Sequence, residues 1–420
     1  MTPTTPAGRL MTVNVNVLGV GQRPAAWRSP DIAPDAIVDR AHWEEVARIA
    51  ERGLIDALFL ADRPAITDPR SRPVQYLDPT VLVPAMAAVT DGLGFVATSS
   101  TTLNDPVELA RRLWALHTAT SGRFAWNAVT TWDVEAVRNF GVEELPERSV
   151  RYARAEEFVT VVRSLWDTAG TDAVVDHEGS ISVHAGLGMD RLVDGRPAIV
   201  QAGGSEPGWR LAGLVADGVY SVDQDPVAAA AHRDTIRGYA VEAGRPADAV
   251  RVFPGLAIVI GSTEREAWER FDHWEHLAPA RYSLNALANA LGTDLVDVDL
   301  DAPVPESVLR DAERRDAGWS AAYRRVLIER IRTEQPSVRR LLRDFGGYGQ
   351  RFLAGTPEQI ADSMESWFRS GAADGFNIML DLFPSGLSDF VDHVVPELQR
   401  RGLFRREYGA RSVLERFAGE

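Results

Sequence analysis

Eight short apolar runs rich in β-branched residues alternate along the chain with amphipathic stretches, and this alternation limits the fold more than any other feature. The stretches between most of the runs place their apolar residues at the spacing of a helix, as in residues 42–53, 106–120 and 151–166. The runs predict strands, and they cover residues 11–17, 56–61, 92–100, 123–130, 198–202, 218–222, 250–260 and 375–380. Eight successive units of a strand and a helix predict an α/β fold. They favour a (β/α)8 TIM barrel over an open sheet.

Two segments do not fit the length of a barrel unit. Residues 167–197 carry Gly, Asp and His without a helical period, and residues 281–350 carry additional helical stretches between the seventh and eighth strands. We interpret both as loop insertions of the kind that cover barrel active sites. The chain is therefore predicted to form a single domain over residues 1–420.

Composition excludes several classes of function. A chain of 420 residues with 45% hydrophobic and 25% charged residues can bury a large core. The net charge of −15 argues against a nucleic-acid surface or an anionic membrane surface as the partner. The start has neither a signal-peptide pattern nor a membrane span, so we expect a cytoplasmic protein. Since the sequence contains no cysteine and no lysine, thiol nucleophiles, thiolate metal ligands and Schiff-base chemistry are excluded.

Two glycine-rich motifs and one histidine pair fail on inspection. GVGQRP (19–24) approaches a dinucleotide fingerprint, but Pro24 replaces the third glycine and no helix follows; no strand is predicted before GGYGQR (346–351). His273 and His276 have a spacing that can bind a metal, but no strand end supplies the remaining ligands, so no metal site is predicted. GxSxG is missing, and the catalytic residues stay unknown.

Polar residues follow the second, third and fourth predicted strands, where barrel active sites form. Asp62 and Arg63 end the second strand, Thr98 the third, and Asn127 the fourth with Trp132 behind it. This mostly uncharged set suits an extended heteroaromatic ring with a phosphate tail better than acid–base chemistry. The alternative is that each residue merely satisfies loop backbone groups.

The fifth strand leads into a glycine turn and a helix, in AIVQAGGSEPG (198–208). A helix that begins at Ser205 would point free N–H groups and the positive end of its dipole at the loop 202–205, a geometry that suits an anion. In the alternative interpretation, Gly203 and Gly204 only let the chain turn and Ser205 only caps the helix.

Segments spread in order over nearly the whole chain carry a resemblance to a known family. They include HWEEVARIAERGLIDALFLAD (42–62), GLGFVATSSTTLNDPVELARR (92–112), SGRFAWNAVTT (121–131), RYARAEEF (151–158), GRPAIVQAGGSEPG (195–208) and GTPEQIADSMESWFRSGAADGFNIML (355–380). In these segments the sequence resembles the flavin-dependent monooxygenases of the bacterial luciferase-like superfamily. Within it, the chain is similar to the branch of nitrilotriacetate, dibenzothiophene-sulfone and long-chain alkane monooxygenases.

The resemblance implies a barrel that binds reduced FMN at the carboxyl ends of its strands. It also implies O2 as co-substrate, a small organic substrate, an NAD(P)H-dependent flavin reductase as partner, and a homodimer or homotetramer. Most of the hard chemistry would belong to the cofactor. By motif, the isoalloxazine ring and ribityl chain would be lined by Asp62, Thr98 and Asn127, and the phosphate would be held by Tyr152, Gly204, Ser205 and Glu206.

One position departs from the family pattern. The family usually has a histidine four residues before the tyrosine of RYxRA, and this chain has Arg148 there. Arg148 could contact a flavin or phosphate oxygen and keep the role by charge, or it could point to solvent. Trp27, Arg63 and Trp132 are further candidates for the pocket wall. Two alternatives stay open: a deazaflavin-dependent oxidoreductase of the same superfamily, and a non-catalytic flavin-binding protein.

Overall fold

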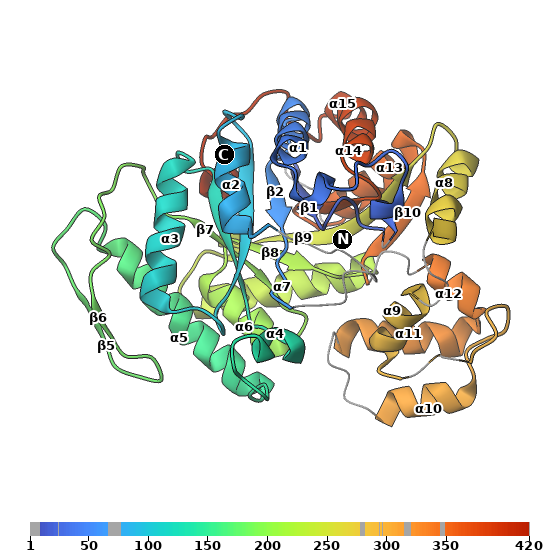
Figure 1. The fold of residues 1–420 in the computed structure, drawn as a ribbon, viewed down its shortest axis with the longest axis horizontal. Coiled ribbons are helices and arrows are strands. Elements are labelled where there is room, and N and C mark those ends of the chain that lie inside the picture. The colour runs from blue at the N-terminus through green and yellow to red at the C-terminus, as the bar shows by residue number, and fades with distance from the viewer. Residues whose placement is uncertain are drawn as a thin grey trace.

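Eight parallel strands form a closed barrel at the centre of the molecule (Figure 1). The computed structural model describes residues 9–23, 25–65, 77–277, 282–293, 295, 297–314, 321–344 and 349–419. The ring closes where β1 pairs with β11, so that Asn14 lies opposite Asn377, and where the first half of β9 pairs with β8. In order around the ring the strands are β1 (Thr12–Val17), β2 (Ala57–Leu60), β3 (Gly94–Ser100), β4 (Phe124–Val129), β7 (Ala198–Ala202), β8 (Gly218–Ser221), β9 (Arg251–Ile260) and β11 (Gly375–Leu380). Each of the eight runs predicted as strands contains one of these barrel strands, and the predicted TIM barrel is confirmed.

Three further strands were not predicted. β10 (Arg351–Gly355) pairs with the second half of β9, from Leu256 to Ile260. β5 (Val175–His177) and β6 (Val183–Ala185) form an antiparallel hairpin that projects from the side of the barrel (Figure 1). These strands have only three to five residues each, so the sequence gives them no clear strand period.

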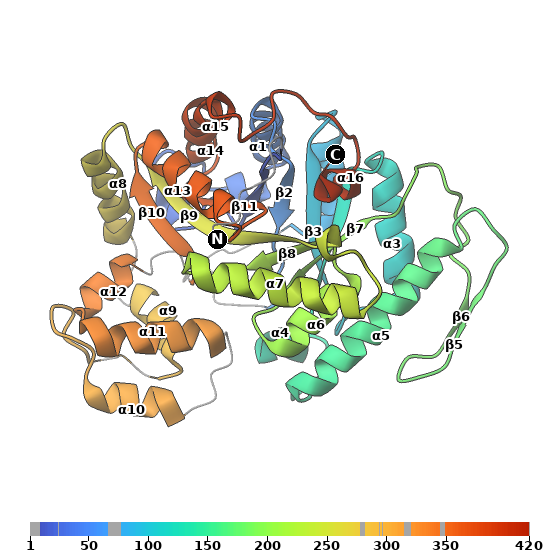
Figure 2. The ribbon, with the colours of Figure 1, turned by 180° about the vertical axis from the view of Figure 1, so that it is seen from behind.

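Helices follow most barrel strands and cover the outside of the ring (Figure 2). Three of them begin with an Asp-Pro pair, in which the aspartate side chain accepts a hydrogen bond from a backbone N–H of the first turn and proline fits that turn. These and the other barrel helices are α1 (Arg40–Arg52), α2 (Pro79–Ala87), α3 (Pro106–Ala119), α4 (Val134–Arg138), α5 (Arg148–Asp167), α6 (Glu206–Val215), α7 (Pro226–Glu242), α8 (Glu264–Leu277) and α13 (Pro357–Arg369).

The last part of the chain closes one end of the barrel. Phe417 of α16 (Val413–Ala418) packs against Phe253 with the ring centres 5.1 Å apart. Both belong to the core inside the barrel, and Val413 lies against Gly94 at the start of β3. Since α16 meets the starts of strands, the opposite end, where the strands finish, is left for a site. The remaining short elements are η1 (Ala26–Arg28), η2 (Ala36–Val38), η3 (Ala247–Ala249), α14 (Ser385–Asp389), η4 (Phe390–Val394) and α15 (Val395–Arg400).

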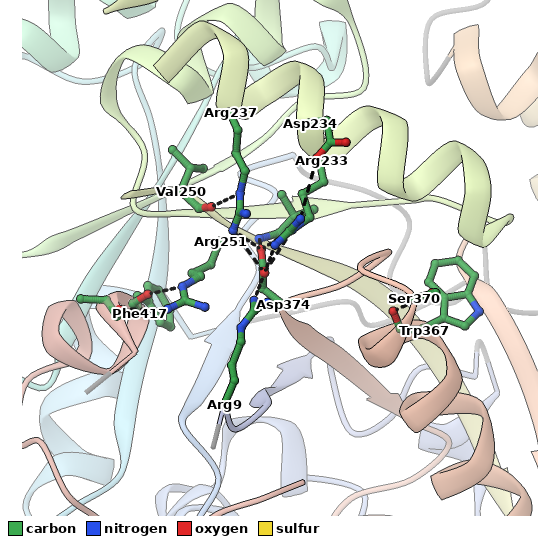
Figure 3. A network of polar contacts seen from close by, with 12 residues as sticks. Arg9, Arg233, Asp234, Arg237, Val250, Arg251, Trp367, Ser370, Asp374 and Phe417 are labelled. Atoms are coloured by element: carbon green, nitrogen blue, oxygen red, sulfur yellow. Dashed lines mark hydrogen bonds and ion pairs between the residues drawn. The ribbon is translucent and has the colours of Figure 1, made fainter. Parts of the chain in front are cut away.

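An ion-pair cluster also stabilises the end of the barrel where the strands start (Figure 3). Asp374, directly before β11, is fully buried and accepts hydrogen bonds from Arg233 at 2.9 Å and from Arg237 at 3.3 Å. Arg9 pairs with the same carboxylate, and the backbone N–H of Val252 donates to it at 2.9 Å. One carboxylate therefore joins the N-terminal segment, β9, β11 and α7.

The two predicted insertions contain separate folded parts. The β5–β6 hairpin lies within residues 167–197. Within residues 281–350 lie α9 (Tyr282–Leu291), α10 (Glu306–Arg314), α11 (Ala321–Glu334) and α12 (Val338–Asp344), which form the group at the lower right of Figure 1. These four helices have a small apolar core of their own, which includes Leu291, Leu309, Leu327 and Leu341. The assignment of the whole chain to one domain stays a prediction.

None of the helices in the described residues is both long enough and apolar enough to cross a bilayer.

Candidate active site

A cavity of about 780 Å³ opens beside the carboxyl ends of β7 and β8. Its walls come from the loop after β4, the first turns of α5, the β7–α6 turn, the β8–α7 loop, one face of α7, and α11 of the second insertion. Five of the predicted site residues line it: Trp132, Arg148, Tyr152, Gly204 and Ser205.

The β7–α6 turn forms one end of this cavity. Ser205 is the N-cap residue of α6, but its side chain makes no capping hydrogen bond. Its hydroxyl oxygen is buried and has no hydrogen-bond partner among the described residues. Since N-cap serines usually bond to their own helix, this hydroxyl is available to a ligand at the positive end of the helix dipole.

The turn is also tightly packed. A Cβ atom on Gly203 would lie 3.1 Å from the Tyr152 hydroxyl and 3.1 Å from Cα of Gly208. A Cβ on Gly208 would meet the same hydroxyl at 3.1 Å. Glycine at both positions therefore lets the Tyr152 hydroxyl approach the turn, where it adds another hydrogen-bonding group beside Ser205.

Two arginines of α5 add positive charge near the turn. Arg151 donates a hydrogen bond to the carbonyl of Thr131 at 2.6 Å, while its Nε is buried without a partner among the described residues. Burial first, and then repulsion from Arg148, lowers the pKa of Arg151. A nearby anion would relieve this repulsion. Arg148 is exposed and also lines the cavity, so its guanidinium can reach a bound ligand.

Thr98 and Asn127 lie inside the barrel near its open end. They are paired across β3 and β4, and the Asn127 amide donates to the Thr98 hydroxyl at 2.9 Å. Both side chains are buried, and the Asn127 Oδ1 has no partner in the described part of the chain. Neither residue lines the 780 Å³ cavity, which begins further round the same end of the barrel.

Asp62 follows β2 and is half-buried. Burial, helped by the charge of Asp78, raises its pKa to about 6. The neighbouring Arg63 forms ion pairs with Asp133 at 2.5 Å and with Glu135 at 3.3 Å. Asp62 and Arg63 lie outside the walls of the cavity, and this pairing holds the Arg63 guanidinium at the start of α4.

Two other predicted residues also lie away from the cavity walls. Trp27 packs against the main core, with the Arg28 guanidinium 4.9 Å from its ring centre. Glu206 is exposed, and its carboxylate accepts a hydrogen bond from the Tyr239 hydroxyl at 3.3 Å. Glu206 can therefore contribute its backbone N–H, but not its carboxylate, to an anion at the turn.

Sequence reasoning missed several polar residues on the barrel strands and on the cavity wall. Asn14, Asn16 and Asn377 are buried, and each has an amide atom without a partner among the described residues. The alternation in TVNVNV was a signal for the first two, because every second residue of a strand points to the same face. On the cavity wall, sequence reasoning missed Trp209, Asp223 and His232.

The chain belongs to the luciferase-like monooxygenase family. A family model described as luciferase-like monooxygenase matches residues 24–374. Nitrilotriacetate monooxygenase component A of Aminobacter aminovorans is 36% identical over 92% of this chain and 92% of its own length. Dibenzothiophene-sulfone monooxygenase of Rhodococcus erythropolis is 33% identical over 91% of this chain and 90% of its own length.

The likeness extends to solved structures. EDTA monooxygenase from Chelativorans sp. BNC1 superposes with a TM-score of 0.81 at 32% identity, covering 98% of this chain and 99% of that one. The predicted family is confirmed, and its members support an oxidoreductase that uses a flavin.

Proposed function

We propose that the protein is the oxygenating component of a two-component monooxygenase, which uses reduced FMN and O2 to oxygenate a small organic molecule. The observation that carries this proposal is the donor-rich turn at the start of α6, in a chain of the luciferase-like family. A hydroxyl that has no partner among the described residues, a helix N-terminus and two arginines line one cavity there. This set of groups fits a phosphate monoester.

Each end of the site has a distinct task in the proposal. Ser205, Tyr152 and the first N–H groups of α6 hold the phosphate, and Arg148 and Arg151 balance its charge. Thr98, Asn127 and Asp62 hold the polar edge of the ring and the ribityl chain. Reduced FMN, when bound, supplies the electrons that activate O2. The protein orients the flavin and keeps bulk water from it.

The proposal includes a partner. A relative of this chain is named component A, which supports a separate component that reduces the flavin. We propose an NAD(P)H-dependent flavin reductase in that role, and a homodimer or homotetramer as the assembly. Light scattering after size-exclusion chromatography checks the assembly.

The test measures binding first and oxygen chemistry second. Photoreduced FMN is titrated into the protein without oxygen, and photoreduced riboflavin and a reduced deazaflavin serve as comparisons. The complex is then mixed with air-saturated buffer, and hydrogen peroxide release is followed with and without a panel of candidate substrates. We expect reduced FMN to bind most tightly of the three. No binding of reduced FMN at high micromolar concentration contradicts the proposal, and tighter binding of the deazaflavin favours the other branch of the superfamily.

A further inference from the structure

A histidine and a tryptophan extend the donor set of the cavity beyond the β7–α6 turn. His232, on the second turn of α7, has a side chain only 10% exposed and lines the cavity. Its Nδ1 lies 2.9 Å from the Asp223 carboxylate, in the loop that precedes the helix. Its ring lies 4.8 Å from the ring of Trp209, centre to centre. Two helices and one loop therefore fix the position of this imidazole.

Three polar side-chain atoms in this part of the molecule are buried and have no partner among the described residues. They are the Nε2 of His232, the Nε1 of Trp209 and the hydroxyl of Ser205. All three residues line the same cavity. Trp209 lies one helical turn after Ser205, since its backbone N–H donates to the Ser205 carbonyl at 2.9 Å. A buried polar atom normally has a hydrogen-bond partner, so three such atoms on residues that line one cavity indicate a polar ligand.

The chemistry of the three atoms indicates which ligand. An indole N–H can only donate, and a serine hydroxyl can donate as well. With its Nδ1–H bonded to a carboxylate, the imidazole donates from Nε2 only when both ring nitrogens carry a proton, and an anion on each side favours that form. A ligand with several acceptor oxygens close together satisfies all three donors, and a phosphate group has this form.

The charged residues of the cavity wall are evenly divided. Arg148 and Arg151 on α5 and Arg325 on α11 line the cavity together with Asp223, Asp225 and Glu329. The two α5 arginines lie on the same helix as Tyr152, whose hydroxyl lies against the β7–α6 turn, so positive charge is present at the end of the cavity near Ser205.

We propose that His232 and Trp209 bind the phosphate of FMN as two further donors, with Asp223 as the residue that orients His232. The inference rests on the proposed function, since it assigns new ligands to the same cofactor. In this arrangement the phosphate lies between α6 and α7 as well as over the N-terminus of α6. The protein then gains selectivity for FMN over riboflavin, which has no phosphate.

The test compares FMN with riboflavin in variants of this pair. Photoreduced FMN and photoreduced riboflavin are titrated anaerobically into the wild type and into His232→Phe, His232→Gln and Asp223→Asn. Phenylalanine keeps a ring against Trp209 without nitrogens, whereas the glutamine amide can donate near the position of Nε2. His184→Phe is the matched control, because His184 also pairs with an aspartate, Asp176, but is 78% exposed on β6.

We expect His232→Phe to weaken FMN binding by roughly 10- to 100-fold, which is the effect of losing a charge-assisted hydrogen bond. His232→Gln should recover part of this lost affinity for FMN. Asp223→Asn should weaken FMN binding less than His232→Phe does. Riboflavin binding should change by less than about twofold in every variant, and it also reports whether each variant is folded.

Two results overturn the inference, and they differ in what they imply for the proposed function. If His232→Phe binds FMN like the wild type, or if FMN and riboflavin weaken equally, His232 is not a phosphate ligand and the proposed function stands. If the wild type fails to bind reduced FMN, both are wrong. Should His232→Phe not fold, Asp223→Asn and His232→Gln carry the same comparison.

Discussion

Replacing Asp374 with asparagine tests how the barrel end opposite the site is held together. The Asp374 carboxylate is completely buried, and Arg9, Arg233 and Arg237 all donate to it. The three arginine side chains are only 20%, 12% and 17% exposed. Asparagine has nearly the same shape, so the change removes the charge and little packing.

The expected loss of stability follows from the charges that remain. Burial, and then repulsion from the neighbouring arginines, already lowers the pKa of Arg9 to about 9 and that of Arg237 to about 10. Without the carboxylate these cations repel one another with no counter-charge. Breaking a buried ion pair from one side costs about 3–5 kcal/mol, and because these arginines are partly solvated we expect about 3 kcal/mol.

Equilibrium unfolding in urea measures this effect as a change in the free energy of unfolding. The control is Asp301→Asn, because Asp301 and Arg339 form an ion pair in which both side chains are more than half exposed, at 72% and 61%. The control should lose less than about 0.5 kcal/mol. If Asp374→Asn loses no more than the control, the cluster does not stabilise the fold and the reasoning is refuted.

Three further predictions concern the site. Ser205→Ala should weaken FMN binding about tenfold and leave riboflavin binding unchanged, as measured by anaerobic titration; equal loss for both ligands would contradict a phosphate contact. Gly203→Ala, whose methyl group would lie 2.6 Å from the Gln201 amide and 3.1 Å from the Tyr152 hydroxyl, should weaken FMN binding similarly, whereas Gly238→Ala on α7, with no atom within 4 Å, should not. Because the pKa of Asp62 is raised to about 6 in the folded protein, its contribution to stability is greatest below pH 3.8 and is lost as the pH rises through 6. Without flavin, the free energy of unfolding of Asp62→Asn, measured in urea, should therefore rise relative to that of the wild type by about 1–2 kcal/mol between pH 4 and pH 7, a figure that allows for solvent screening. A difference between the two proteins that does not vary with pH would oppose this reasoning.

Most of the barrel could be predicted because its strands are encoded locally. Parallel barrel strands are buried on both faces, so each one reads as a short apolar run, such as GFNIML for β11. β10 was missed because its sequence, RFLAG, is short and its pairing with β9 depends on residues about a hundred positions earlier. Arg351 at its start also masks the apolar character of the strand.

The same difference separates the predicted and the missed parts of the site. The β7–α6 turn was predicted because a strand, two glycines, a serine and a helix follow one another directly in the sequence. The contact between Trp209 and His232 depends on how α6 packs on α7, and no local pattern encodes it. Asn14 and Asn377 meet only because the barrel closes between its first and last strands.

A structure of the protein crystallised with FMN tests the central claim most directly. We predict the phosphate over the N-terminus of α6, within about 3 Å of the Ser205 hydroxyl, and the ring directed toward Thr98 and Asn127. A phosphate located elsewhere, with the Ser205 hydroxyl free of any contact to it, would contradict the account.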